Sequence, residues 1–450
     1  MSSPTVAVIG GGLAGLAASI ALADSGFQVQ LFERSPRLGG RATSYALSGN
    51  EVIDNCQHVT LRCCTNLEDF YRRIGVADKI RYFDRLDFSD SDGHISPIQS
   101  GSLPAPFHLA ASFMKFQFLN WSDKRGIAGA MLGILTSSGR PKLAEGMTML
   151  DWLRKQKQTP AAINRFWRTV LVSALNEELD RMDAAYGIAV FWKAFLANPN
   201  GFIMGVPKVP LSDLYTLRNE RIQVHLRRGV DGLLLEKNAV RGVHLDDGTE
   251  IVADYTIAAT TIDRLLKMLP EELRQHRAYT ELASVPVSPI TSVHLWFDRP
   301  VMERPFLTVL DQTVQWIFNR SNQYLQIVIS ASHSLSEKSQ SEIVELCRSE
   351  LASILPASKT ATLARSVVVR ETAATFSPTP GCDRWRPSQK TPIRNFFIAG
   401  DWTQTGWPAT MESAVRSGYL AAEGILALEG KPVQLVLPEL PATGFAKWFN

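Results

Sequence analysis

The chain of 450 residues has few cysteines, little excess charge and no long apolar run. Its five cysteines are odd in number and unpatterned, which argues against a disulfide framework and against cysteine-rich metal sites. The formal net charge of +3, without a basic run carrying interleaved aromatics, excludes nucleic acid as an expected partner. No stretch of about 18 apolar residues occurs, so the sequence predicts no transmembrane helix.

Two segments imitate targeting signals. The apolar N-terminus has no preceding positive charge and is interrupted by glycines, unlike a secretory signal peptide. Residues 440–444 read Leu-Pro-Ala-Thr-Gly, as in a sortase signal, but neither a spanning helix nor a basic tail follows them. We therefore expect a cytoplasmic protein. Metal ligands are not clustered, and no nucleophile–histidine–acid order is present, so neither a metal site nor a hydrolytic triad is predicted.

The stretch that organises the chain reads strand, glycine turn, helix. A β-branched run over residues 5–9 is typical of a buried parallel strand. Gly10, Gly12 and Gly15 then form G-x-G-x-x-G: the first permits a tight turn, the second lets the backbone approach a pyrophosphate, and the third lets the helix lie close to the strand. Leu13 and Ala14 open that helix, whose N-terminus offers free N–H groups to phosphate.

A second glycine turn follows the next strand. Residues 29–32 predict that strand, and Glu33 ends it at the position of a ribose-binding carboxylate. Arg34 and then Gly39-Gly40-Arg41 come next, and a nicotinamide domain does not need this turn. The combination resembles the flavoprotein family of amine oxidases, protoporphyrinogen oxidases and carotenoid desaturases. The resemblance implies FAD as the cofactor, with Arg41 contacting its pyrophosphate or flavin; a plain surface salt bridge is the alternative.

A second constellation lies some 390 residues downstream. Gly400-Asp401 ends a strand, and a helix opens at Met411-Glu412. A carboxylate at a strand end can accept a ribityl hydroxyl, and helical N–H groups can donate to the carbonyl oxygens of a flavin ring. The resemblance also implies that the backbone at Val230 contacts adenine.

The predicted fold class is α/β: a Rossmann-like FAD-binding domain with an interleaved α+β substrate domain. The FAD-binding domain is expected to comprise residues 1–85, 216–285 and 376–430. Residues 86–215, mostly helical, and the sheet segment 286–375 are expected to form the substrate domain, followed by a tail at 431–450. Thr65 is expected to cap a helix that ends before Gly75.

Residues 103–135 combine many aromatics with interspersed lysine and arginine, and predict two amphipathic helices. Two interpretations stay open for them. They either pack the core of the substrate domain or form a face in contact with a membrane or with lipid. The short aromatic tail at 445–449 fits the second interpretation, in which the protein is peripheral to the inner face of the membrane.

Three features narrow the resemblance. Cys382, the last cysteine, precedes Gly400, and no lysine occurs between Lys267 and Lys338, which disfavours a covalently bound flavin and an amine substrate. The motif from Gly400 to Gly418 is similar to the carotenoid-desaturase branch. Residues 54–59 (Asp-Asn-Cys-Gln-His-Val) and 65–75 look like the bacterial squalene-associated branch, that of the hydroxysqualene dehydroxylases. Cys56 departs from that pattern, in which glycine is usual, so its role is open.

The resemblance implies reduction of an allylic C–OH on a C30 isoprenoid, giving squalene and water in squalene and hopanoid biosynthesis. Hydroxide leaves poorly, so an acid should protonate it, and Asp54 and His58 are the candidates. Each has a structural alternative, a fold-holding carboxylate and a structural hydrogen bond. Two rival functions are an oxidative carotenoid or phytoene desaturase and a non-catalytic flavin-binding scaffold of the squalene pathway. The expected partners are a long isoprenoid, an electron donor and other squalene-pathway enzymes.

Overall fold

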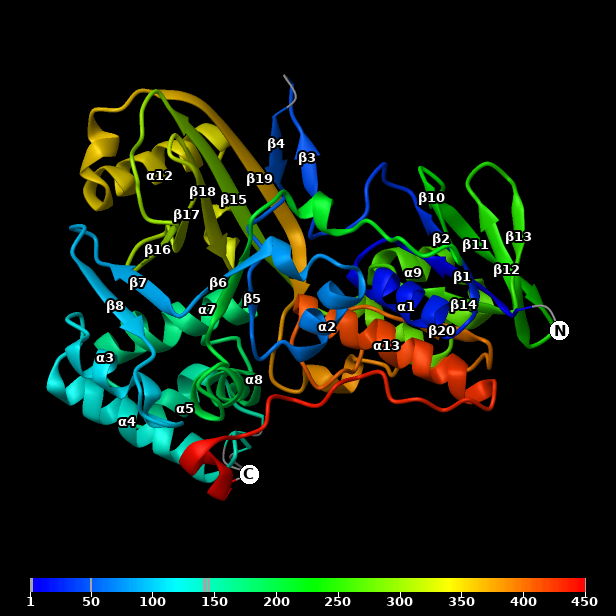
Figure 1. Cartoon of the computed structure of the whole chain (residues 1–450), viewed down its shortest axis with the longest axis horizontal. Helices are drawn as coiled ribbons and strands as arrows, with labels where there is room; N and C mark the ends of the chain where they lie inside the picture. Colours follow the sequence, from blue (N-terminus) through cyan, green and yellow to red (C-terminus); the bar gives the residue numbers. More distant parts are fainter. Residues whose placement is uncertain (1–2, 49–50, 141–143, 145, 450) are drawn as a thin grey trace.

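Two lobes lie side by side in the computed structural model, each built on its own large sheet (Figure 1). The structure describes residues 3–48, 51–140, 144 and 146–449. The first lobe contains a five-stranded parallel sheet and the second a seven-stranded sheet. The predicted α/β fold class is thereby confirmed.

The parallel sheet assembles strands from three distant parts of the chain. In spatial order they are β10 (Ile222–Leu226), β2 (Gln28–Glu33), β1 (Thr5–Ile9), β14 (Tyr255–Ala258) and β20 (Phe396–Ile398). Every pair is parallel, so the carboxyl ends of these strands share one edge of the sheet. Ligands of open parallel sheets bind at that edge.

Helices cover one face of this sheet. α1 (Leu13–Asp24) and α13 (Met411–Leu428) pack together, and α2 (Thr65–Arg73) lies against α13. Val6 and Val8 of β1 face these helices. Gly418 allows the close approach of the two long helices, because a Cβ there would lie 2.2 Å from the Ala14 carbonyl oxygen.

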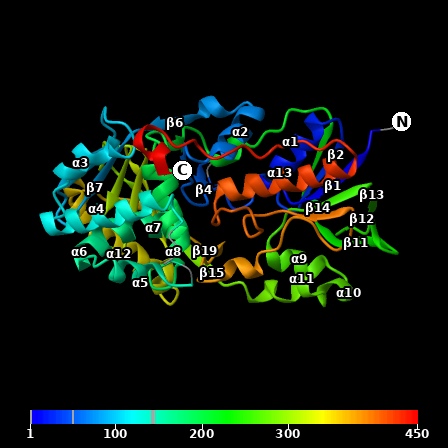
Figure 2. The same ribbon diagram turned by 90° about the horizontal axis from the view of Figure 1, so that it is seen from below.

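The opposite face packs on a smaller antiparallel sheet and on helices. That sheet consists of β11 (Val230–Glu236), β12 (Ala239–Leu245) and β13 (Glu250–Val252), and the helices are α9 (Ile262–Met268), α10 (Glu271–Arg274) and α11 (Arg277–Thr280). Figure 2 shows α1 and α13 on one side of the parallel strands and α9 to α11 on the other. Successive side chains of β1 point to opposite faces of the sheet. Val6 and Val8 therefore pack against the helices α1 and α13, whereas Ala7 and Ile9 belong to the hydrophobic cluster on the opposite face.

In the large sheet of the second lobe, side chains also alternate between the two faces, so that one face is aliphatic and the other is polar and aromatic. Its strands, in spatial order, are β19 (Leu363–Phe376), β15 (Val287–Phe297), β18 (Tyr324–Ser330), β17 (Trp316–Ser321), β16 (Phe306–Val309), β7 (Arg85–Ser89) and β8 (Ile95–Gln99). One face is aliphatic and is covered by α12 (Gln340–Ile354). The other face carries Ser292, His294 and Trp296 and turns away from α12.

Residues 86–215 are not helical throughout. The hairpin β7–β8 joins the large sheet through β16, and β9 (Met204–Pro207) pairs with β5 (Thr60–Leu61) and β6 (Ile80–Phe83). The helices of this part are α3 (Ala110–Lys115), α4 (Trp121–Thr136), α5 (Met149–Lys155), α6 (Pro160–Ala162), α7 (Thr169–Leu175) and α8 (Ala184–Val190). Two π-helical segments, Ile163–Arg168 and Phe191–Leu196, continue α6 and α8. Within the described ranges, no helix is long and apolar enough to cross a membrane.

The C-terminal tail joins the two lobes. It leaves α13, passes α2 and ends beside α4 in the 3-10 turn Gly444–Phe449 (Figure 1). Glu439 receives hydrogen bonds from Trp407, which follows β20, and from Lys193 in the second lobe. Further along, the backbone N–H of Phe445 donates to Ala105.

Candidate functional site

Three glycine turns meet at the carboxyl edge of the parallel sheet. Gly10 has a φ of +104°, and a Cβ there would lie 2.5 Å from the Ala259 carbonyl oxygen. Gly12 and Gly40 face each other, with the Cβ position of Gly40 only 3.1 Å from the Gly12 Cα. The Gly39 N–H donates to Gly11 over 2.8 Å, which locks the first two turns together. A side chain at Gly10 or Gly40 would therefore clash with neighbouring backbone, and the turns meet through backbone atoms.

Such a surface suits a pyrophosphate. Gly15 lets α1 begin close behind the first turn, because a Cβ there would lie 2.0 Å from the Gly10 carbonyl oxygen. Leu13 and Ala14 are the buried first residues of α1, and the N–H groups of a first helical turn have no partners within the helix. A group with negative charge is stabilised there by the helix dipole.

Glu33 ends β2 beside this turn. Its carboxylate accepts hydrogen bonds of 2.7 Å from the N–H groups of Gly11 and Ser35. Arg34 is exposed and its Cβ lies near Gly229, next to Val230 at the start of β11. Glu33, Arg34 and Val230 therefore stand on the same side of the glycine turns, where the sequence analysis expected the ribose and adenine.

Arg41 and Asp401 connect the second turn with the third. The Arg41 Nη2 lies 2.5 Å from Oδ1 of Asp401, and its Nη1 donates to the Ala374 carbonyl oxygen over 2.6 Å. The Asp401 carboxylate raises the pKa of Arg41 further. Gly400 precedes Asp401 with a φ of +154°, and a Cβ there would lie 2.4 Å from the indole nitrogen of Trp402. The strand end thus aims the carboxylate back at the glycine turns.

The helix α13 begins at Met411, close to the third turn. Thr410 caps it through a hydrogen bond from Ser413 N–H. The side chain of Glu412 does not point toward the glycine turns. It is fully buried and accepts hydrogen bonds from the backbone N–H groups of Asn66 and Leu67, over 3.2 and 2.8 Å. Any contact of Glu412 with a cofactor would therefore be through its backbone.

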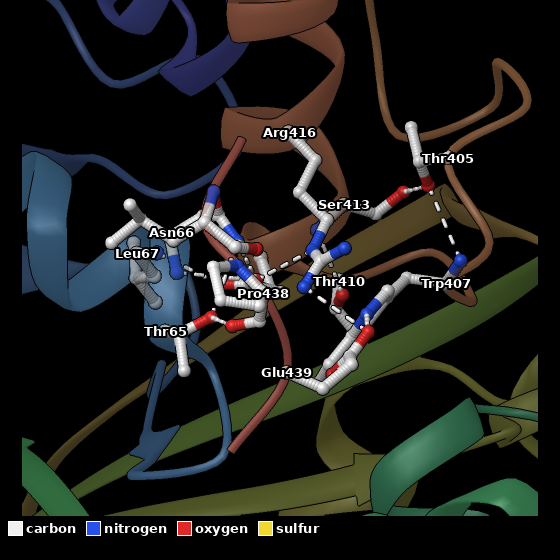
Figure 3. A network of polar contacts seen from close by, with 12 residues as sticks. Thr65, Asn66, Leu67, Thr405, Trp407, Thr410, Ser413, Arg416, Pro438 and Glu439 are labelled. Atoms are coloured by element: carbon white, nitrogen blue, oxygen red, sulfur yellow. Dashed lines mark hydrogen bonds and ion pairs between the residues drawn. The ribbon is translucent and has the colours of Figure 1, made fainter. Parts of the chain in front are cut away.

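Glu412 also corrects the expected cap of α2. Thr65 lies inside that helix rather than before it, and its hydroxyl donates to Pro438 of the tail. The N–H groups at the start of α2 are instead satisfied by the Glu412 carboxylate, which Arg416 holds through a 2.7 Å hydrogen bond. Figure 3 shows Asn66, Leu67, Arg416 and Glu439 close together between α2, α13 and the tail.

Asp54 is the buried last residue of β4 (Val52–Asp54), the partner of β3 (Ser44–Ala46), and the half-buried His58 lies in the loop that follows it. Asp54 accepts hydrogen bonds from Ser44 and from the Leu211 N–H, and forms a 2.8 Å ion pair with Arg320. The His58 Nδ1 lies 3.0 Å from the Cys56 carbonyl oxygen.

The protonation states of His58 and Cys56 limit which protons this loop can give to a substrate. Burial lowers the pKa of His58, so its imidazole is neutral at neutral pH. Burial raises the pKa of Cys56 to about 12, which keeps that thiol protonated and unreactive. The contacts of Asp54 and His58 match the structural alternatives considered for them, a fold-holding carboxylate and a structural hydrogen bond.

Arg320 connects the Asp54 loop to the second lobe. It lies on β17, and its Nη1 donates to the Gln57 amide oxygen over 2.6 Å. Around it, the face of the sheet that turns away from α12 carries polar and aromatic side chains: Ser292, His294, Trp296, Phe306, Trp316, Phe318, Tyr324 and Gln326. We call this set the substrate face.

A buried hydrogen-bonded chain crosses the substrate face. The His294 Nδ1 lies 2.7 Å from the Tyr324 hydroxyl, and its Nε2 lies 3.3 Å from the Ser292 hydroxyl, which also accepts from Gln326. Burial and, secondarily, the charge of Arg320 lower the pKa of His294 to about 4, while burial raises that of Tyr324. The signal for this chain in the sequence is the alternation of polar residues with Val293 and Leu295 in a strand, but that alternation does not name the hydrogen-bond partners.

One grouping of possible metal ligands also escaped the sequence analysis. Asp90, Asp92 and His94 lie in the turn of the β7–β8 hairpin, with ligand atoms within 4.8 Å of one another. The Asp90 carboxylate already accepts hydrogen bonds from the Asp92 and His94 N–H groups and from the His94 ring. These contacts account for the grouping as a hydrogen-bonded turn.

Comparison with known proteins identifies the family. The family model "Flavin containing amine oxidoreductase" matches residues 13–426. The chain belongs to this family of flavoenzymes. It is therefore an FAD-dependent oxidoreductase, and the glycine turns form a surface that fits the ADP half of FAD.

Curated relatives of this flavoenzyme include two carotenoid enzymes. It is 26% identical to 15-cis-phytoene desaturase from an Oncidium hybrid cultivar, over 98% of this chain and 81% of that one. It is 25% identical to zeta-carotene desaturase from Arabidopsis thaliana, over 93% of this chain and 85% of the relative. Among solved structures, cyclohexylamine oxidase from Brevibacterium oxydans shares the fold, with a TM-score of 0.68 and 15% identity over 95% of this chain and all of the other.

Proposed function

We propose that this flavoenzyme reduces hydroxysqualene to squalene, replacing the allylic hydroxyl with hydrogen and releasing water. The observation that carries the proposal is the contact of Asp54 and Gln57 with Arg320. The loop that resembles the squalene-associated branch thereby borders the aromatic substrate face. The relatives named after phytoene and zeta-carotene add support for a long isoprenoid substrate.

The substrate face suits such a chain. Trp316 and Phe318 stack at 5.8 Å, and Phe306 lies 6.1 Å from Phe318. Aromatic rings of this kind bind apolar chains through large contact areas and need no polar group on the substrate. The hydrogen-bonded side chains of Ser292, His294, Tyr324 and Gln326 lie on the same face as Arg320, where a single hydroxyl could be held.

The reaction needs one hydride and one proton: R–OH + H⁻ + H⁺ gives R–H and water. Bound reduced FAD supplies the hydride. Arg320 is placed to hold the departing oxygen, since a guanidinium has five N–H donors and its contacts with Gln57 and Asp54 leave others for the substrate. Because Asp54 balances the charge of Arg320, this hydrogen bonding adds no net positive charge next to an allylic cation.

We assign the proton to the Tyr324–His294 pair. The raised pKa of Tyr324 keeps its phenol protonated, so the phenol can give its proton to the departing hydroxide, which leaves as water. The phenolate that remains would be hydrogen-bonded by the neutral imidazole of His294 and would regain its proton from solvent. The Asp54 carboxylate then acts as the group that positions Arg320, in place of the acid role expected from the sequence.

Oxidative desaturation of a carotenoid precursor is the second candidate, and the names of the matched relatives favour it. In that direction a C–H bond loses hydride to oxidised FAD, and the neutral His294 would accept the proton lost from the neighbouring carbon.

An anaerobic single-turnover experiment separates the two reactions. Protein that carries photoreduced FAD is mixed with hydroxysqualene. In a parallel experiment, protein that carries oxidised FAD is mixed with phytoene. We expect flavin reoxidation at the rate at which squalene forms. Desaturated phytoene without squalene formation would replace the first candidate by the second, and a flavin that responds to neither substrate would leave only a scaffold role.

A further inference from the structure

Half of the exposed large apolar side chains of the described residues gather at one place on the molecule. Of fourteen such side chains among the described residues, seven lie in residues 103–132 and 445–448. They are Leu103, Phe107, Met114, Trp121, Leu132, Phe445 and Trp448, and they include all four exposed aromatics of that set. Trp121 is 69% exposed and Trp448 is 76% exposed, fractions that a side chain packed in a core does not have.

The two segments adjoin each other in space. The rings of Phe107 and Phe445 are 6.0 Å apart, and that of Trp448 is 5.2 Å from Phe445. The C-terminal turn contacts α4, beside which it lies in Figure 1. On the other side of α4, the Lys124 Nζ donates to the Met114 carbonyl oxygen and ties α3 to it.

Helix α4 is apolar on its exposed side as well as on its buried one. Ile127, Ala130 and Ile134 are buried, whereas the opposite side presents Trp121 and Leu132, which lie about three turns apart. The exposed residues between Trp121 and Leu132 are the small residues Ser122, Ala128 and Gly129 and one charged residue, Arg125. A helix that is apolar all round is normally covered on all sides.

The charges around these side chains have one sign. Residues 101–140 and 444–449 carry five basic residues, Lys115, Lys124, Arg125, Arg140 and Lys447, against one acid. That acid, Asp123, is buried and engaged in capping α4, so it does not offset the basic groups at the surface. The chain as a whole is almost balanced, with 47 basic and 44 acidic residues, so the excess is local.

We propose that this set, the docking surface, binds an anionic lipid membrane. Aromatic side chains enter the interfacial region while lysine and arginine reach the phosphate groups, a combination that fits a lipid surface. The inference does not depend on the proposed reaction. It adds a source for a lipid-borne substrate, and Phe113 behind the docking surface packs against the same apolar cluster that contains Phe318 of the substrate face.

The test is flotation of the FAD-loaded protein with vesicles of phosphatidylcholine, with and without phosphatidylglycerol. We expect flotation with the anionic vesicles that weakens as salt is added. Trp121→Ala combined with Trp448→Ala should lower the vesicle partition coefficient roughly tenfold or more. Arg125→Gln and Lys447→Gln should each lower it about fivefold on anionic vesicles and leave it unchanged on neutral ones.

Matched controls are Val252→Ala, an exposed apolar residue on β13, and Arg241→Gln, an exposed charge on β12. Both should leave flotation unchanged. Flavin absorbance and thermal unfolding report whether each variant folds. Absence of flotation by the wild type, or equal loss in the controls, overturns the proposal. So does self-association in lipid-free solution that the double tryptophan variant abolishes, because the docking surface would then join two copies of the chain.

Discussion

Arg41 and Asp401 are 360 positions apart in the chain, yet their charged atoms lie 2.5 Å apart at the edge of the parallel sheet. Asp401→Asn should weaken FAD binding roughly tenfold to a hundredfold, because a hydrogen bond to a charged group contributes about 1.5–3 kcal/mol. Titration of the apoprotein with FAD, followed by flavin fluorescence, measures this change. Asp311→Asn breaks an exposed pair with Arg165 in the second lobe and serves as the control. Equal FAD affinity in both variants would remove Asp401 from the cofactor site.

Glu412 should matter more for stability than for flavin chemistry. Its buried carboxylate satisfies the start of α2 and pairs with Arg416. Glu412→Ala leaves N–H groups and a cation without a partner, which should lower the free energy of unfolding by about 3–5 kcal/mol. Denaturant unfolding of the FAD-free protein measures it, with the exposed Glu271→Ala as control. A loss below about 1 kcal/mol would contradict the capping role.

His294 predicts a stability loss in acid. Its pKa is about 4 in the folded protein against an ordinary value of 6.5, so between these values the unfolded chain binds more protons. Stability should therefore be complete above about pH 6.5 and fall toward pH 4, with a slope of at most about 1.4 kcal/mol per pH unit from this group. Urea unfolding at several pH values should show a shallower slope for His294→Gln.

His94 serves as a control for the His294 prediction, because its pKa is shifted in the opposite direction. Its hydrogen bond to Asp90 raises its pKa, so its contribution is present at low pH and is lost as pH rises through the folded value. His94→Gln should leave the acid slope intact. If His294→Gln and wild type lost stability in parallel between pH 6.5 and 4, His294 would not be the group that titrates.

Tyr324 should affect the chemical step rather than cofactor binding. Tyr324→Phe keeps the ring stacked on Trp296, at 4.5 Å, and removes the hydroxyl next to His294. We expect single-turnover squalene formation to slow by roughly 10²–10⁴-fold, the usual contribution of a positioned acid. FAD affinity should stay the same. Tyr255→Phe, which removes a hydroxyl bonded to Glu429 in the first lobe, is the matched control.

The glycine turns at the cofactor end of the site could be predicted from the sequence, because they are formed by backbone conformations and close approaches that only glycine permits. Gly10, Gly15 and Gly40 are required where chain segments approach closely, and such requirements are local in sequence. The destination of a long side chain is not local. Glu412 reaches a helix 346 positions away, and Arg320 meets Asp54 only because two lobes come together. Hydrophobic periodicity places a residue on a face of an element but does not name its partner.

The assembly of the parallel sheet sets an order of events during synthesis. β20, Asp401 and the start of α13 are the last parts of the FAD site to leave the ribosome, whereas β1 and the first glycine turn are made first. Domains generally fold as units while the chain is still growing, but this one lacks its final strand until Ile398 has been added. Nascent chains must therefore hold the edge of β14 unpaired while the residues between β14 and β20 are synthesised, and capture of the cofactor becomes a late event in the making of each molecule.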